Sequence, residues 1–236
     1  MAAPIAPASE RGYTPPMTVA AIVLVPDLAV ALSDADGEPA VRRVVQAAWS
    51  GGALPIVVVS DVAGDDVAAA LEGLPVTLTV PGPDEPRGVA WFLHGIRAAH
   101  TAVADATAGL LWPARCAWVD PETVTSLVEL HGAAPGELVR PAFAGQAGFP
   151  ILVPLPVAEK LAAWPDLHAY QAVEALVREG APARTPELGD PGIVFDVATP
   201  RAELPGFEGP PAPAGAVPEW NAELAAQAQA SGEAAG

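Results

Sequence analysis

The chain has 236 residues, of which 51% are hydrophobic and 6% aromatic, so it is long enough to bury a substantial core of Ala, Val and Leu. Its 28 acidic residues outnumber 11 basic ones and give a formal net charge of −17, so most of the surface repels nucleic acid and anionic membranes. No apolar run approaches the roughly 18 residues of a membrane span, and the single Cys116 permits no internal disulfide, so we expect a cytoplasmic protein.

The first half of the chain alternates apolar runs with amphipathic segments. The run Thr18–Val25 is continuously apolar and partly β-branched, which is typical of a buried parallel strand. Further strands are predicted at 54–59 and 76–80, with helices at 39–49 and 65–71 between them. Because right-handed crossovers join such units, the pattern predicts a parallel, layered sheet.

The second half continues the alternation and predicts one three-layer α/β/α domain over residues 17–207. Its expected elements are helices at 88–103, 121–131, 157–164 and 169–179, strands at 110–112 and 192–197, and two short strands around a Gly-rich turn within 138–154. Residues 1–16 and the Pro/Ala-rich tail 208–236 are expected to be disordered, and for the segment 220–230 we prefer disorder over a short helix for a partner.

The segment that follows the predicted strand 110–112 indicates where a pocket lies. The strand ends at Pro113 and Arg115, and after a short loop Asp120-Pro121-Glu122 opens a helix. Ligands of open α/β sheets bind just beyond such strand ends. Arg115 and Asp120 are therefore candidate pocket residues.

Several motifs, taken in order from about Thr18 to Phe207, resemble the MobA/MocA-like nucleotidyltransferases. They are AAIVL in the first strand, Gly37-x-Pro39, Gly88, WVDPETV (118–124), RPAFAGQAGFPILV (140–153) and DPGIVFDVATPRAEL (190–204). The resemblance implies a Rossmann-like fold of the nucleotide-diphospho-sugar transferase type. It also implies transfer of a nucleoside monophosphate from an NTP to a phosphorylated acceptor, notably molybdopterin.

The loop after the first strand departs from the family pattern. There the family has a Gly-rich run, L-A-A-G-x-S-x-R-M-G, followed by a lysine, and these groups hold the triphosphate. This chain has Pro26-Asp27 and no arginine or lysine between Arg11 and Arg42. Proline removes an N–H donor, and the aspartate adds a charge of the same sign as the phosphates, so we expect the triphosphate cradle to be lost.

Both carboxylates that the family uses to hold its metal are also replaced. Arg115 takes the place of the aspartate in the family's D-Q-P motif, and Ala198 that of the second aspartate in D-I-D-T-P, which leaves Asp196 beside it. Magnesium needs oxygen ligands, and an arginine repels it. We therefore predict no metal ligands and name no cofactor, and expect Mg²⁺ only if the site is reorganised.

Three interpretations of Arg115 remain open. It forms a structural salt bridge with Asp120 or Asp196; or it recognises a phosphate or carboxylate, for which arginine suits bidentate contact; or it replaces the metal in residual catalysis.

Other motifs are weaker. Gly88, beside Arg87, either offers helix-start N–H donors to an anion or to the edge of a base, or is an ordinary helix start. Gly145 and Gly148 either let the backbone approach an acceptor or simply form a hairpin turn. The four histidines, at 94, 100, 131 and 168, have no spacing typical of a zinc site, and Cys116 is expected to be a buried structural thiol.

These observations favour a divergent family member with a degenerate active site, without metal-dependent catalysis, that retains a nucleotide- or anion-binding or accessory role related to the molybdenum cofactor. One alternative is an active nucleotidyltransferase with a site reorganised around Arg115, and another is a structural subunit that binds a protein partner. The candidate ligand-binding residues are Pro26, Asp27, Gly88, Arg115, Asp120, Gly145, Gly148 and Asp196.

Overall fold

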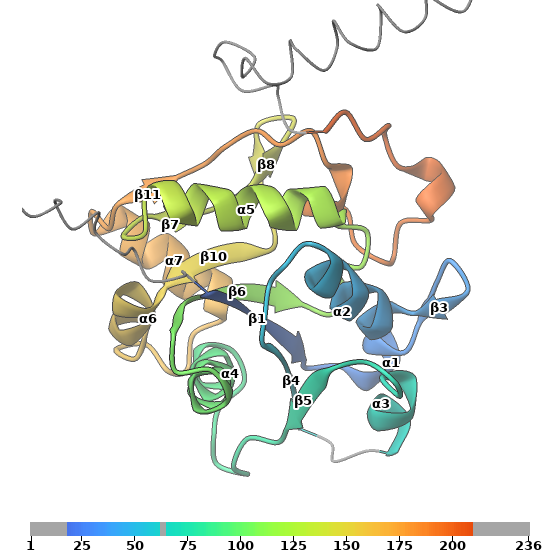
Figure 1. The fold of residues 1–236 in the computed structure, drawn as a ribbon, viewed down its shortest axis with the longest axis horizontal. Helices are drawn as coiled ribbons and strands as arrows, with labels where there is room; N and C mark the ends of the chain where they lie inside the picture. Colours follow the sequence, from blue (N-terminus) through green and yellow to red (C-terminus); the bar gives the residue numbers. More distant parts are fainter. Residues whose placement is uncertain (1–17, 62–64, 210–236) are drawn as a thin grey trace, which may run out of the picture.

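The computed structural model describes residues 18–61 and 65–209. A seven-stranded sheet crosses the molecule in the order β11-β7-β10-β6-β1-β4-β5 (Figure 1). Its strands are β1 (Thr18–Val25), β4 (Ile56–Ser60), β5 (Val76–Thr79), β6 (Ala106–Pro113), β7 (Leu138–Val139), β10 (Ile151–Pro154) and β11 (Ala183–Arg184). The strands β1, β4, β5 and β6 run parallel, whereas β10 is antiparallel to both β6 and β7.

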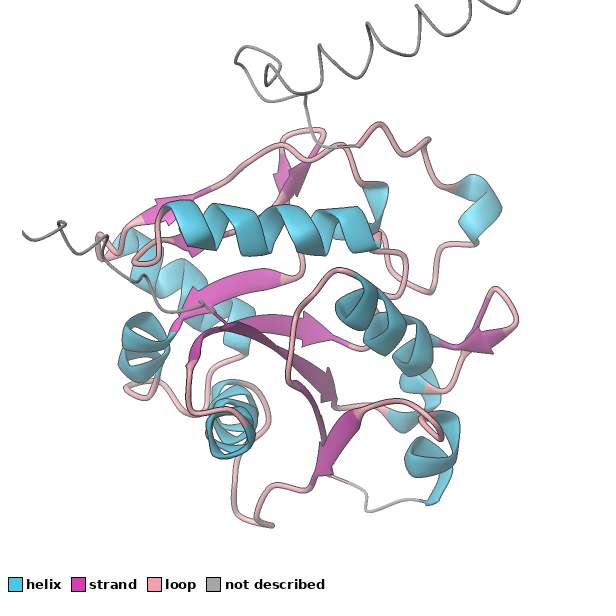
Figure 2. Cartoon of the chain, viewed as in Figure 1, coloured by secondary structure: helices cyan, strands magenta, loops and turns pink. Residues whose placement is uncertain are grey.

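Helices cover both faces of this sheet (Figure 2). They are α1 (Leu28–Ala31), α2 (Ala40–Ser50), α3 (Asp65–Ala70), α4 (Val89–Ala102), α5 (Pro121–Ala133), α6 (Leu155–Leu161) and α7 (Ala169–Arg178). Side chains of α2, α3 and α5 form one apolar core, and those of α4, α6 and α7 form the other. The predicted three-layer, mostly parallel α/β fold is thus confirmed.

Strand β1 shows why the sheet is buried on both faces. Val19, Ala21 and Val23 point into the core under α2 and α5, and the alternate residues Ala20 and Ile22 point into the core under α4. Successive side chains of a strand face opposite sides, so the unbroken apolar run supplies both cores.

Two small hairpins lie outside the central sheet: β2 (Asp34–Ala35) pairs with β3 (Glu38–Pro39), and β8 (Ala142–Phe143) pairs with β9 (Gln146–Ala147). The segment 138–154 thus holds four short strands where two were predicted. The outer two, β7 and β10, join the central sheet, and the inner two form the hairpin around Ala144-Gly145, both of which have positive φ.

The predicted strand at 192–197 is wrong. A 3-10 helix, η1 (Pro191–Ile193), begins this segment, and a second one, η2 (Arg201–Glu203), follows it. Asp190 caps η1 by accepting a hydrogen bond from Gly192 N at 2.8 Å, and Pro191 favours the helical turn. Residues 190–199 run as an irregular segment beside the β6–α5 loop, to which the N–H of Val197 is joined by a hydrogen bond of 2.9 Å to the Arg115 carbonyl oxygen.

No helix within the described ranges is both long enough and apolar enough to span a bilayer. The predicted leader 1–16 and the segment 220–230 lie outside the described residues, and so does the tail from residue 210 onwards.

Candidate functional site

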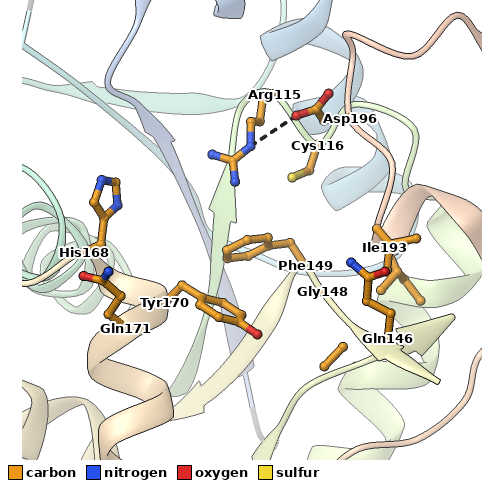
Figure 3. Close-up of a pocket in the computed structure, with 12 residues that line it drawn as sticks. Arg115, Cys116, Gln146, Gly148, Phe149, His168, Tyr170, Gln171, Ile193 and Asp196 are labelled. Atoms are coloured by element: carbon orange, nitrogen blue, oxygen red, sulfur yellow. Dashed lines mark ion pairs between the residues drawn. The ribbon is translucent and has the colours of Figure 1, made fainter.

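A cleft opens at the carboxyl ends of β1 and β6, where open α/β sheets bind their ligands. It consists of two adjoining cavities of about 440 and 260 Å³. Four residues line both cavities: Arg115, Phe149, His168 and Tyr170. We call the larger one, which also has Gln146, Gln171 and Asp196 in its wall, the polar cavity (Figure 3). The smaller one, which has Leu24, Trp91 and Leu111 in its wall, is called the apolar cavity.

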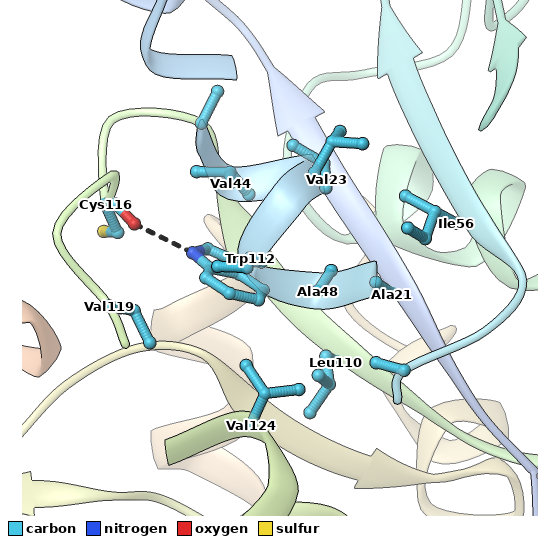
Figure 4. Packing of buried hydrophobic residues seen from close by; sticks show 14 of the residues in the cluster. Ala21, Val23, Val44, Ala48, Ile56, Leu110, Trp112, Cys116, Val119 and Val124 are labelled. Carbon is cyan, nitrogen blue, oxygen red and sulfur yellow. Dashed lines mark hydrogen bonds between the residues drawn. The ribbon is translucent and has the colours of Figure 1, made fainter. Parts of the chain in front are cut away.

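Trp112 fixes the loop that carries Arg115 into this cleft. Its side chain is fully buried between β6 and the helices above it, and its indole N–H donates to the carbonyl oxygen of Cys116 at 3.0 Å (Figure 4). The N–H of Ala114 donates to the carbonyl oxygen of Leu24 at 2.9 Å and ties the loop to the end of β1. The backbone of Arg115 is therefore held while its side chain extends outwards.

Arg115 lies where the two cavities meet. Its Nε atom is 3.4 Å from a carboxylate oxygen of Asp196, and its guanidinium carbon lies 5.7 Å from the centre of the Phe149 ring. Its two terminal nitrogens point away from Asp196 and into the cleft (Figure 3). The side chain is 47% exposed, so the ion pair leaves bidentate donors available to a ligand.

Asp120 is not the partner of Arg115. Its carboxylate accepts a hydrogen bond from Glu122 N at 3.1 Å and caps α5, and its own N–H donates to Asp190 at 2.9 Å. Of the two salt bridges considered from the sequence, the one to Asp196 is present. Asp120 serves the start of α5 and lies outside both cavities.

Asp196 is held in place by interactions of both its side chain and its backbone. Its carboxylate accepts from Ala198 N at 3.0 Å as well as facing Arg115, and its carbonyl oxygen accepts from the Trp118 indole at 2.9 Å. The N–H of Val197 donates to the Arg115 carbonyl oxygen at 2.9 Å. The segment that follows η1 is thereby fastened to the Arg115 loop through both its backbone and its side chains.

The loop after β1 folds differently from a phosphate cradle. Asp27 accepts hydrogen bonds from the N–H groups of Ala29 and Val30 at 2.9 and 3.2 Å, and so caps the short helix α1. The protein's own carboxylate thus takes the donors at the end of β1. Pro26 lines the apolar cavity, and both residues line a further cavity of about 190 Å³ that also touches Arg115.

The three candidate glycines have different roles. Gly88 has a φ of 109°, lines the apolar cavity and starts α4, and a Cβ there would collide with the carbonyl oxygen of Leu167. Gly145 lies in the exposed β8–β9 turn, outside both cavities. Gly148 lines the polar cavity, where its missing Cβ makes room for the Ile193 backbone. Gly148 is therefore explained by chain packing.

The aromatic floor and the far wall of the cleft were not predicted from the sequence. The rings of Phe149 and Tyr170 are 5.7 Å apart and tilted by 56°. His168 and Tyr170 both come from the start of α7, on the side of the cleft opposite Arg115 (Figure 3). Burial raises the pKa of Tyr170, and the nearby Glu174 adds to this, so its hydroxyl stays protonated and can donate. Phe149 belongs to the RPAFAGQAGFPILV motif, but nothing in the sequence marks the residues of α7.

Cys116 follows Arg115 yet is buried, as expected. Burial raises the pKa of its thiol to about 12, and the opposing effect of Arg115 is smaller. The thiol is therefore protonated at neutral pH and is not a nucleophile.

A divalent cation does not fit the residues present. In the described parts of the chain, no group of three or more His, Cys, Asp or Glu side chains is arranged to hold a metal ion. At the two positions that the family resemblance assigns to metal ligands stand a guanidinium and a methyl group, those of Arg115 and Ala198. The remaining carboxylate, that of Asp196, is paired with Arg115.

The layered sheet and its strand-end cleft define a nucleotidyltransferase-like α/β domain with a Rossmann-like fold. The chain belongs to the MobA-like NTP transferase domain family, whose model matches residues 31–183. The Pro26-Asp27 loop and the 190–199 segment lie on either side of the matched range.

Solved structures support the same fold. A nucleotidyl transferase from Methanothermobacter superposes with a TM-score of 0.59 at 17% identity, covering 70% of this chain and 85% of that one. Rv0371c from Mycobacterium tuberculosis, in complex with manganese, gives 0.56 at 21% identity, covering 73% and 88%. The 4-diphosphocytidyl-2C-methyl-D-erythritol synthase from Anaerococcus prevotii gives 0.59 at 11% identity, covering 78% and 91%. No curated protein sequence matches the chain significantly.

Proposed function

We propose that the protein binds a nucleotide or another small organic anion at Arg115 and does not catalyse metal-dependent nucleotidyl transfer. The observation that carries this proposal is the position of Arg115 at the junction of the two cavities, with its terminal nitrogens turned into the cleft. A guanidinium in that orientation can hold a phosphate or carboxylate through two parallel hydrogen bonds.

The chemistry of the remaining groups argues against the family's reaction. Phosphoryl transfer relies on a cation that neutralises the developing charge and aligns the phosphates. Arg115 would repel such a cation and Ala198 offers it no ligand. Asp196, the one carboxylate left, is already paired.

The loop after β1 argues against a triphosphate as the ligand. The carboxylate of Asp27 accepts the N–H groups of Ala29 and Val30, and Pro26 has no N–H to offer. A polyphosphate placed there would meet a fixed negative charge. A ligand with a single phosphate or carboxylate avoids this repulsion.

We further propose that this binding role is related to the molybdenum cofactor, because molybdopterin is the acceptor that the family resemblance implies. An accessory protein of this kind would hold a nucleotide or a cofactor-related anion without transforming it. The fixed Arg115–Asp196 pair is compatible with that role, since it needs no metal to hold its geometry.

Turnover assays test the loss of catalysis. The full chain, incubated with GTP, CTP or ATP, with Mg²⁺ or Mn²⁺ and with molybdopterin, should release no pyrophosphate above background. Sustained release that disappears in Arg115→Gln would instead establish an active enzyme with a reorganised site. A charge-matched control is Arg178→Gln, which removes an exposed arginine at the far end of α7.

A further inference from the structure

We infer that a clasp on the surface beside the cleft holds Asp196 against Arg115 and thereby sets the affinity of the cleft for anions. The clasp consists of four residues that meet outside the walls of both cavities: Asp36, Arg43, Trp118 and Arg201. The inference rests on the proposed function and deepens it, because it concerns how the Arg115 site is controlled. Asp196 acts as an internal competitor for the positive charge that a ligand would use.

One loop carries both the cation of the cleft and the anchor of its competitor. Arg115 and Trp118 lie three residues apart in the loop between β6 and α5. Opposite them the segment after η1 makes a turn, in which Thr199 N donates to the Asp196 carbonyl oxygen at 2.9 Å. The Trp118 indole N–H donates to the carbonyl oxygens at both ends of this turn, to Asp196 at 2.9 Å and to Thr199 at 3.0 Å. The turn is thus attached to the loop through Trp118 as well as through the Arg115–Asp196 ion pair.

The carboxylate of Asp196 is divided between the turn and Arg115. One of its oxygens accepts from Ala198 N at 3.0 Å, and the other lies 3.4 Å from the Arg115 Nε atom. A negative charge at this distance offsets part of the positive charge of the guanidinium. An anion that binds Arg115 therefore does so against the nearby charge of Asp196. If the turn moves away from Arg115, the affinity for an anion should rise.

Two arginines from distant parts of the chain hold the Trp118 ring. The guanidinium carbons of Arg43, in α2, and Arg201, in η2, lie 5.3 and 5.9 Å from the ring centre. Both side chains also reach the same carboxylate oxygen of Asp36, at 3.8 and 3.5 Å. Asp36 has a φ of 64° and lies in the turn between β2 and β3. The indole is thereby held with its N–H directed at the turn that carries Asp196.

Arg201 links the clasp directly to the competitor, because it lies two residues after Thr199, where the turn ends. Its contacts with the Trp118 ring and with Asp36 fasten the chain on that side of the turn. The hydrogen bond from Val197 N to the Arg115 carbonyl oxygen does not involve the clasp and should persist without it. We therefore expect a weakened clasp to loosen Asp196 without releasing the whole segment.

The sign of the effect distinguishes this role from a merely structural one. Arg201→Gln removes a positive charge, which ordinarily weakens anion binding or leaves it unchanged. If the clasp holds Asp196, the affinity of the full chain for inorganic phosphate, measured by calorimetry, should instead rise about two- to fivefold, as expected for loss of a partly exposed ion pair. Arg178→Gln removes an equal charge far from the clasp and should give no rise.

A second variant changes the clasp without changing its charge. Trp118→Phe keeps a ring between the arginines and the turn but removes the donor to both carbonyl oxygens, so it should also raise the affinity for phosphate. Asp196→Asn removes the competitor itself. The double variant Asp196→Asn/Arg201→Gln should therefore bind phosphate no more tightly than Asp196→Asn alone, because the clasp then has no charge to position.

A measurement without ligand separates this inference from the proposed function. In NMR spectra of the ¹⁵N-labelled full chain, the Arg115 Nε–H signal, assigned by its loss in Arg115→Gln, should shift in Arg201→Gln and Trp118→Phe in the direction seen in Asp196→Asn. The inference is overturned if this signal does not shift, if neither clasp variant raises the affinity for phosphate, or if the gains in the double variant are additive. In each of these cases the proposed function still stands, provided that Arg115→Gln abolishes phosphate binding. Binding that survives Arg115→Gln would overturn both.

Discussion

The Nε atom of Arg115 lies 3.4 Å from a carboxylate oxygen of Asp196 at the mouth of the cleft. Arg115 belongs to the loop after β6, whereas Asp196 belongs to the segment after η1. Arg115 stands where the family resemblance expects one metal-binding carboxylate, and Asp196 lies two residues before Ala198, which stands where it expects the other. The side chains that meet at this point therefore have opposite charges. On the proposed function, Arg115 binds an anion where the resemblance places a cation.

Removing the partner of Arg115 should strengthen anion binding. In Asp196→Asn the guanidinium is no longer partly neutralised, so the affinity for inorganic phosphate measured by calorimetry should rise by a few fold. The free energy of unfolding should change by about 0–1 kcal/mol, because the pair is partly exposed. Weaker binding would contradict this account, because it would mean that Asp196 itself contacts the ligand or an accompanying cation.

Substitution of Gly88 should damage the contact between the start of α4 and the Leu167 backbone. Gly88→Ala places a methyl group against the Leu167 carbonyl at a residue whose φ is 109°, so we expect a loss of about 2–4 kcal/mol in the free energy of unfolding. Urea unfolding measures this loss. Gly82→Ala, in the same loop, is the control, because its Cβ meets nothing closer than 3.8 Å. Equal stability of the two variants would refute the packing argument.

The loop that presents Arg115 should depend on Trp112. Trp112→Phe removes the donor to the Cys116 carbonyl and leaves a small void in a fully buried position. Chemical denaturation should show a loss of about 1–3 kcal/mol. Trp49→Phe is a matched control, since Trp49 is 49% exposed and should tolerate the change. If Trp112→Phe were as stable as the control, the hydrogen bond would not fix the loop.

Cys116 should make stability depend on pH in the alkaline range. Its folded pKa of about 12 exceeds the ordinary value of 9.0, so the folded state keeps a proton that the unfolded state loses. The stabilisation is therefore complete below pH 9 and is lost as the pH rises towards 12. Cys116→Ala should flatten this slope in alkaline denaturation curves. Iodoacetamide at pH 8 should label the thiol only after unfolding, and rapid labelling of the folded chain would contradict its burial.

The sequence predicts the core of this fold because hydrophobic periodicity determines burial. The unbroken apolar run of β1 requires burial on both faces of the strand, and the helical spacing of apolar residues in α2 and α4 requires burial on one face of each helix. The structure has these three elements within a few residues of the expected bounds. The run IVFDV at 193–197 shares the apolar content of a strand. Its structure is decided instead by the cap at Asp190 and by the hydrogen bond from Val197 N to the Arg115 carbonyl oxygen, which only the tertiary fold reveals.

Part of the candidate site could also be predicted, because the ends of apolar runs indicate where strands end. Arg115 could be placed at a strand end from the sequence, and so could Pro26 at the end of β1. His168 and Tyr170 start a helix that lies more than fifty residues later in the chain than Arg115. The packing of Tyr170 on Phe149 and the hydrogen bond from Val89 N to the Leu167 carbonyl bring this helix to the cleft, and the sequence reveals neither contact. The cap that Asp27 makes on α1 was also hidden, because α1 has too few residues for a periodic pattern.

A thermal-shift titration with a nucleoside monophosphate, with and without Mg²⁺, tests the central claim most directly. Ligands that bind the folded state raise its melting temperature by mass action. We predict a concentration-dependent rise that is the same with and without Mg²⁺, that is lost in Arg115→Gln and that is kept in Arg178→Gln. A rise that requires Mg²⁺, or that persists unchanged in Arg115→Gln, would contradict the proposal that Arg115 binds the anion in place of a metal.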